Sequence, residues 1–215
     1  MKAIGMKAIG LTEFGGPDVL RVLELPVPEA GPGEIRIRVH AATVNPVDTM
    51  VRRGIAFVSD AEPPYVPGMD AAGVVEQIGE GVDTDLAVGD HVMAVVVVSG
   101  TRGAYAEHLV VPAESVVRVP AGATDIEAAT LPMNGLTAHM ALDLLELPAG
   151  ATVAVTGAAG AVGGYAVQLA KADGLRVIAD ARSCPRRRSS AGRHGSSVRR
   201  RTRWSSRNRR GCARR

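Results

Sequence analysis

The first half of the chain alternates short apolar runs with glycine and proline. Residues 34–40 alternate polar and apolar side chains, which is the pattern of a strand with one buried face. Further short strands are expected at residues 72–78, 90–98 and 104–110. Many short strands, separated by loops of this composition, predict an antiparallel, barrel-like β domain.

The pattern changes near Pro120, where helices begin to alternate with strands. Thr124 and Glu127 have the spacing of a capping box, which opens a short helix, and a second helix is expected from about Gly135 to Glu146. The segments that follow are a strand at 152–156, a glycine-rich turn at 157–164, a helix at 165–171 and a strand at 175–179. This order is one βαβ unit, the beginning of an α/β domain.

Charge divides the chain near residue 182. Residues 1–182 contain 12 Lys and Arg and all 22 Asp and Glu, whereas residues 183–215 contain 13 Arg, 7 Ser and no acid. The basic tail has no apolar periodicity to offset its chain entropy, so we expect it to be disordered. Both cysteines, Cys184 and Cys212, lie in this tail. With no apolar run long enough for a membrane span and no cysteine in the body, a cytoplasmic location is expected.

The glycine-rich turn carries the first candidate chemistry. It follows an apolar strand and opens a helix, which is the setting of a dinucleotide-binding fingerprint. Small residues allow a tight turn and a close approach of the backbone to a pyrophosphate, and the helix N-terminus offers unpaired N–H groups to that anion. The candidate cofactor-binding residues are Ala158, Ala159, Gly160, Ala161, Val162 and Gly163. The alternative is a plain glycine-rich connection between strand and helix.

Further motifs lie before this turn. Residues 41–54 place Asn45 at a strand end and directly before Pro46, where an Asn can also cap the following helix. The other motifs are Pro-Gly-Met-Asp-Ala-Ala-Gly-Val-Val at 67–75, Gly-Ala-Tyr-Ala-Glu at 103–107 and Asn-Gly-Leu-Thr-Ala at 134–138. In this order and spacing, the chain resembles medium-chain dehydrogenases/reductases of the quinone oxidoreductase branch, the zeta-crystallin-like enzymes, from Met6 to about Ala181.

The resemblance implies both a fold and an activity. The fold class is α+β then α/β: a GroES-like β-barrel catalytic domain at residues 6–122, an incomplete Rossmann βαβ unit at 123–182 and the disordered basic tail at 183–215. The implied reaction is hydride transfer from NADPH, with NADH as the alternative, to a quinone or an α,β-unsaturated carbonyl (enone). Asn45 and Thr137 match polar positions that flank the nicotinamide in the resembling enzymes, and they are the candidate catalytic residues.

The same resemblance argues against a metal. The zinc-dependent branch binds catalytic zinc through Cys and His, whereas Asn45 and Met69 stand at those positions here. No metal site is predicted, and hydrogen bonds are expected to polarise the substrate carbonyl. Many relatives carry Tyr where this chain has Met50. Asp48 could serve as a proton donor, but an Asp two residues after a Pro more often stabilises the start of a helix, and it is interpreted in that way. Four scattered histidines are interpreted as packed or surface side chains: His40, His91, His108 and His139.

Two interpretations of the basic tail stay open. A complete dinucleotide fold has about six strands, and the pattern here ends after two, so the first interpretation is a truncation or frame change that impairs the reductase and removes the family's dimer edge. The second is a non-enzymatic remnant whose cationic tail binds nucleic acid non-specifically through phosphates. The expected partners are therefore a small quinone or enone, no membrane, and nucleic acid only through the tail.

Overall fold

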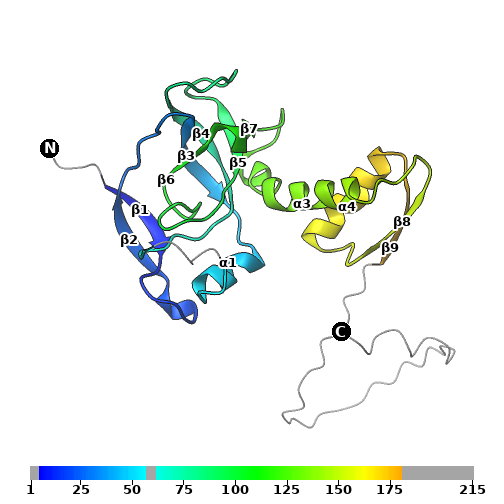
Figure 1. Ribbon diagram of the computed structural model, residues 1–215, viewed down its shortest axis with the longest axis horizontal. Helices are drawn as coiled ribbons and strands as arrows, with labels where there is room; N and C mark the ends of the chain where they lie inside the picture. Colours follow the sequence, from blue (N-terminus) through cyan, green and yellow to red (C-terminus); the bar gives the residue numbers. More distant parts are fainter. Residues whose placement is uncertain (1–4, 57–61, 181–215) are drawn as a thin grey trace, which may run out of the picture. The chain divides into compact units, whose positions relative to one another are not determined.

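The computed structural model describes residues 5–56 and 62–180, shown as the coloured ribbon of Figure 1. The predictions for the basic tail, residues 183–215, lie outside these residues. Among the described residues, no helix combines the length and the apolar composition needed to cross a bilayer.

The N-terminal part is built on antiparallel strands, as predicted. β1 (Gly5–Gly10) pairs with β2 (Arg21–Pro26) in a two-stranded sheet. A second sheet has five strands in the order β6-β3-β4-β5-β7. Their bounds are Glu34–Ala42 for β3, Asp70–Ile78 for β4, His91–Val95 for β5, His108–Pro112 for β6 and Val116–Arg118 for β7. Short helical turns lie at η1 (Pro17–Val19), α1 (Pro46–Arg52) and η2 (Ala113–Ser115).

Alternating burial in β3 confirms the sequence pattern. Ile35 and Ile37 are fully buried, while Arg36 and Glu34 between and beside them are only partly buried. The two isoleucines pack in the main apolar cluster, whose other members include Val75, Val92, Leu109 and Val111. Because burial of each such side chain contributes about 1.5–3 kcal/mol, this cluster fixes the register of the sheet.

The prediction of a strand at residues 104–110 is wrong for its first half. Strand β6 begins only at His108, because the backbone N–H groups of Ala104 and Tyr105 donate to the carbonyls of Gly68 and Pro67 in a loop. A Cβ at Gly103 would lie 1.9 Å from the carbonyl oxygen of Val66, so only glycine permits this close approach. The strand expected at 90–98 also ends early, at Val95.

Two helices follow the β domain. The capping box that opens α2 (Asp125–Ala128) is confirmed, since Thr124 N–H donates to the Glu127 carboxylate at 2.9 Å and Glu127 N–H donates to the Thr124 hydroxyl at 3.3 Å. Helix α3 (Pro132–Asp143) begins three residues before the expected Gly135. Proline suits this first helical position because it has no N–H to leave unpaired.

The predicted βαβ unit is present. β8 (Thr152–Thr156) and β9 (Arg176–Asp180) pair in parallel, and α4 (Ala161–Ala172) connects them. The helix starts four residues earlier than the expected Tyr165, because Gly160 takes the N-cap position and its carbonyl accepts the Gly164 N–H at 2.8 Å. The predicted fold class, a β domain followed by the start of an α/β domain, is therefore confirmed for the described residues.

Candidate functional site

Three polar side chains are buried where β3, α1 and β4 meet. Asn45 is 6% exposed, Asp48 is 5% exposed and Asp70 is completely buried. A buried carboxylate is tolerated only when donors surround it, so the hydrogen bonds of these residues define the site.

Asp70 connects the β domain to helix α3. Its Oδ2 accepts hydrogen bonds from the Thr43 hydroxyl at 2.5 Å and from Asn45 Nδ2 at 2.6 Å. Its Oδ1 accepts the backbone N–H of Met133, in the first turn of α3, at 2.6 Å. A carboxylate at this position also faces the positive end of the helix dipole. Asp70, the first residue of β4, therefore caps a helix that starts 62 positions later in the chain.

Asp48 organises the neighbouring loop. Its Oδ2 accepts the backbone N–H of Asn45 at 2.6 Å and the Tyr105 hydroxyl at 2.9 Å, and its Oδ1 accepts the Gly68 N–H at 3.1 Å. The expectation that Asp48 stabilises the start of α1 is thus confirmed. Burial, and then the charge of Asp48, raise the pKa of Tyr105 well above its ordinary value, so this phenol stays protonated and donates to the carboxylate.

The two candidate catalytic residues lie in different surroundings. Asn45 uses Nδ2 to donate to Asp70 and, at 3.2 Å, to the Thr43 hydroxyl. Thr137 is exposed on α3, and its hydroxyl donates to the Met133 carbonyl at 2.6 Å. Among the described residues, the side chain on α3 that bonds Asn45 is Asn134, whose Nδ2 lies 3.5 Å from Asn45 Oδ1.

Asn134 was missed as a site residue, although it belongs to the same sequence motif as Thr137. The two are three positions apart, so they share one side of the helix. Helical spacing was the signal that could have found it.

Met69 and Asn45, which stand where the zinc-dependent branch is expected to bind zinc, lie in an apolar cluster and in a hydrogen-bond network. Met69 is 6% exposed and packs against Val51 and Val98 in an apolar cluster. The amide nitrogen of Asn45 is committed to Asp70, and an amide nitrogen is not a donor that Zn²⁺ uses. Met50, which replaces the frequent Tyr, is 41% exposed on α1.

The glycine-rich turn folds around two glycines. Gly157 has φ +70°, a left-handed conformation that favours glycine. A Cβ at Gly163 would lie 2.3 Å from the Gly157 carbonyl oxygen and 2.8 Å from Ala158 Cα. Helix α4 can therefore approach the turn this closely only if residue 163 lacks a side chain.

The structure brings together the six candidate cofactor-binding residues, and their N–H groups differ in availability. Ala158 N–H donates to the Asp180 carbonyl at 3.1 Å, and Gly160 N–H donates to the Gly157 carbonyl at 2.8 Å. The N–H groups of residues 161–163 lie in the first turn of α4 and have no intrahelical acceptor. These three groups lie at the positive end of the helix dipole, a position that favours an anion.

Comparison with known proteins agrees with this architecture. Residues 31–121 match the alcohol dehydrogenase GroES-like domain. Quinone oxidoreductase of Sus scrofa is 37% identical over 180 residues, which cover 82% of this chain and 53% of that protein. The structure of the quinone oxidoreductase from Coxiella burnetii superposes with a TM-score of 0.74 at 35% identity, over 82% of this chain and 56% of that one. A mycobacterial protein solved in complex with NADPH has a TM-score of 0.69 at 38% identity, over 81% of this chain and 52% of that one.

The fold and these similarities define the class of protein: a GroES-like domain followed by part of a Rossmann-like domain. Within that class, the chain is similar to proteins of the quinone oxidoreductase branch of the medium-chain dehydrogenases/reductases, the branch that its motifs predicted. It spans about half the length of the curated relatives it matches, 53% in the case of the pig protein.

Proposed function

We propose that this chain contributes the substrate side and the cofactor turn of an NADPH-dependent oxidoreductase that reduces a quinone or an enone. The observation that carries the proposal is the contact of α4 with the glycine turn, where a Cβ at Gly163 would fill the space that the backbone uses. Such a turn, between a parallel strand and a helix, suits a pyrophosphate. When bound, NADPH supplies the hydride.

The residues that would hold the cofactor follow from the turn. The N–H groups of residues 161–163 would donate to the pyrophosphate, while Ala158, Ala159 and Gly160 would shape the turn beneath it. We propose NADPH, rather than NADH, as the cofactor because a similar mycobacterial protein was solved in complex with NADPH.

For the reacting end, we propose that Asn45 and Thr137 lie beside the nicotinamide. Both residues already donate a hydrogen bond within the protein. The Thr137 hydroxyl donates to the Met133 carbonyl, and the Asn45 amide donates to the Asp70 carboxylate. Either residue must exchange an internal hydrogen bond before it can donate to a substrate carbonyl. The network around Asp70 would keep Asn45 in place for that exchange.

We propose that no zinc takes part at the Asn45 and Met69 positions. Met69 presents a thioether to an apolar cluster, and Asn45 presents an amide that is bonded to Asp70. Without a Lewis acid at that place, hydrogen-bond donors would polarise the acceptor carbonyl.

We further propose that the GroES-like domain spans residues 6–122 and that a Rossmann domain begins at 123–182. We also propose that residues 1–215 alone turn over substrate slowly. Among the described residues, the parallel sheet contains only β8 and β9, against about six strands in a complete dinucleotide fold. Two strands can contact only part of the cofactor. Hydride transfer needs the nicotinamide at near-attack distance, and small misplacements cost orders of magnitude in rate.

The test is NADPH binding, measured by cofactor fluorescence, in two variants that each add one methyl group. In Gly163→Ala the new Cβ would lie 2.3 Å from the Gly157 carbonyl, whereas in Gly164→Ala the nearest contact is 3.9 Å, from Ala158. Loss of one hydrogen bond to the charged pyrophosphate costs about 1.5–3 kcal/mol. This corresponds to a dissociation constant about ten- to a hundredfold weaker for Gly163→Ala.

We expect Gly164→Ala to bind NADPH like the wild type. Equal affinity of both variants, or no saturable binding of NADPH or NADH by the wild type, would refute the proposed role of the turn.

A further inference from the structure

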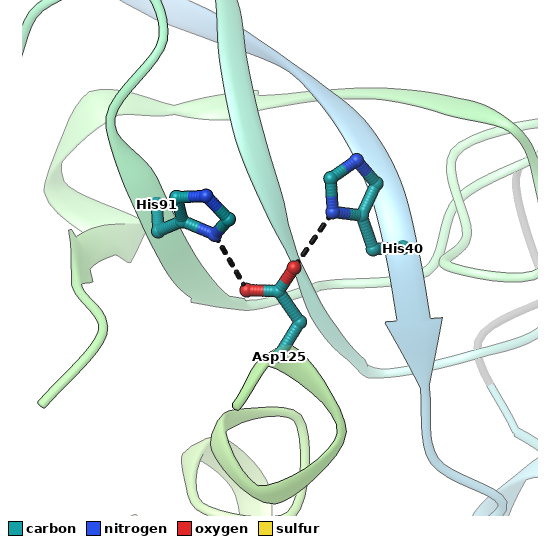
Figure 2. Close-up of side chains that lie close together, drawn as sticks. All are labelled: His40, His91 and Asp125. Carbon is teal, nitrogen blue, oxygen red and sulfur yellow. Dashed lines mark hydrogen bonds and ion pairs between the residues drawn. The ribbon is translucent and has the colours of Figure 1, made fainter. Parts of the chain in front are cut away.

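Two histidines and one aspartate from three separate segments converge at one point (Figure 2). His40 lies near the end of β3, His91 begins β5, and Asp125 is the first residue of α2. His40 Nδ1 lies 2.6 Å from Asp125 Oδ2, and His91 Nδ1 lies 2.9 Å from Asp125 Oδ1. One ligand atom from each of the three residues lies within 4.8 Å of the others.

We propose that His40, His91 and Asp125 bind a divalent transition-metal ion of the Zn²⁺ type. Imidazole nitrogen and carboxylate oxygen are both ligands of Zn²⁺, with bonds of about 2.0–2.2 Å. Two such ligand atoms are about 2.9 Å apart at a right angle on the ion, and about 3.3 Å apart at the tetrahedral angle. The observed N···O separations of 2.6 and 2.9 Å, one to each oxygen of the carboxylate, would need to widen by up to about 0.3 Å for a right angle and up to about 0.7 Å for the tetrahedral angle.

The surroundings leave room for an ion and its waters. The exposed fraction of the side chain is 60% for His91, 31% for His40 and 16% for Asp125. The two imidazole rings meet edge to face, at an angle of 68° with their centres 6.1 Å apart, and both direct Nδ1 toward the same carboxylate, as Figure 2 shows. Three protein ligands with an accessible fourth position suit an ion that keeps a water molecule.

Two other histidines of the described chain pair with one carboxylate each. His108 lies 2.8 Å from Glu76, and His139 lies 2.8 Å from Asp143, one turn away on α3. Each pair offers one imidazole, whereas the proposed site offers two. A bound ion at the proposed site would join β3 and β5 to α2, so it would hold the first helix after the β domain against the five-stranded sheet.

This proposal departs from the expectation that the chain has no metal site. That expectation concerned the positions that bind zinc in the related branch, and it treated the histidines as scattered. His40 and Asp125 are 85 positions apart, and His91 and Asp125 are 34 apart, so folding alone brings them together.

The experiment is a titration with Zn²⁺, followed by competition with a chromophoric chelator, on the full chain carrying Cys184→Ser and Cys212→Ser. These two changes remove both cysteines of the sequence, because cysteine is itself a ligand that Zn²⁺ favours. His40→Ala and His91→Ala are compared with the matched control His139→Ala, which removes an equally exposed imidazole that bonds one aspartate. Because His91 and His139 side chains are 60% and 61% exposed, neither change disturbs the core.

We expect one Zn²⁺ per chain in the background protein and in His139→Ala. Removal of a partner behind a ligand costs about 10–100-fold in metal affinity, so removal of a ligand should cost at least tenfold in His40→Ala and in His91→Ala. Zn²⁺ should also raise the unfolding temperature of the background protein and not of these two variants, since the ion binds only the folded site.

Unchanged zinc affinity in His91→Ala, or an equal loss in His139→Ala, would overturn the proposal. The first result would leave the cluster as an ion-paired surface contact, and the second would assign the binding to isolated imidazoles.

Discussion

Replacement of Asp70 should destabilise the chain strongly, because this fully buried carboxylate satisfies three donors at once. In Asp70→Ala, the Thr43 hydroxyl, the Asn45 amide and the Met133 N–H lose their acceptor. A buried donor left without a partner costs about 1–3 kcal/mol, and loss of one partner from a buried charged contact costs about 3–5 kcal/mol in total. We therefore expect the free energy of unfolding to fall by about 3–5 kcal/mol, against a typical total of about 5–15 kcal/mol.

The assay is urea unfolding, together with hydrogen exchange at the Met133 amide. Asp143→Ala is the matched control, because the Asp143 side chain is 67% exposed and bonds His139 on the surface of α3. The control should change the free energy of unfolding by less than about 0.5 kcal/mol. Asp70→Asn keeps one carbonyl oxygen, so it should lose less stability than Asp70→Ala and provides the measurement if the alanine variant does not fold.

The replacement of Asp70 should also change hydrogen exchange locally, at the start of α3. If Asp70 caps α3, the Met133 amide should exchange faster in Asp70→Asn, while amides in β8 and β9 keep their wild-type protection. Equal unfolding midpoints for Asp70→Asn, Asp143→Ala and the wild type would refute the reasoning, because they would mean that the buried carboxylate contributes nothing net.

Two further predictions concern titration. Burial first, and Asp48 second, raise the pKa of Tyr105, so its contribution to stability is complete below the ordinary tyrosine value of about 10 and is lost as the pH rises through the folded value. Absorbance of tyrosinate at pH 10.5 should therefore be the same in wild type and Tyr105→Phe, and one additional ionised phenol in the wild type would contradict this. Desolvation raises the pKa of Asp125, but hydrogen bonds from His91 and His40 outweigh it and the pKa is lowered. That contribution to stability is present above the ordinary aspartate pKa of about 3.9 and is lost as the pH falls through the folded pKa. Between pH 5 and pH 3, the free energy of unfolding in urea should therefore fall more for the wild type than for Asp125→Asn. Parallel decreases in the two proteins would disprove this.

The sequence predicted those parts of the fold that depend on local pattern. The polar and apolar alternation of β3 corresponds to a strand because burial of its apolar side chains dictates it. The apolar run of β8 also corresponds to a strand, although its valines are only partly buried in the described residues. The segment at residues 104–107 was wrongly predicted as a strand. Its composition suits a strand, but its N–H groups bond the loop at Pro67 and Gly68, which no local pattern records.

Helix starts were predicted less well than helix positions. The start of α2 was correct because its capping box lies entirely within Thr124–Glu127. The start of α3 was placed too late, since the acceptor for its first turn is Asp70, a residue of another strand. The start of α4 was also placed too late, because a glycine-rich segment was interpreted as turn although its second half is helical.

The candidate sites also differ in whether their residues are neighbours in sequence or meet only in the fold. The proposed cofactor turn is one continuous segment, so its glycines could be recognised from sequence alone, and the structure adds which N–H groups are available. The buried network at Asn45 and the cluster at His40, His91 and Asp125 draw on residues far apart in sequence. No spacing rule joins such residues, and only the packing of the helices against the strands does so.

The network around Asn45 also limits how this residue can act. An amide nitrogen carries two hydrogens, and both have acceptors here, Asp70 at 2.6 Å and Thr43 at 3.2 Å. The longer bond is the weaker one, so the Thr43 contact is the one that a substrate carbonyl would replace. Asp70 would then keep the planar amide oriented, and the substrate carbonyl would approach its second hydrogen. Under the proposed role of Asn45, the carboxylate that fixes the start of α3 would also hold the donor at the reacting end. One buried charge would then support both the stability of the chain and its chemistry.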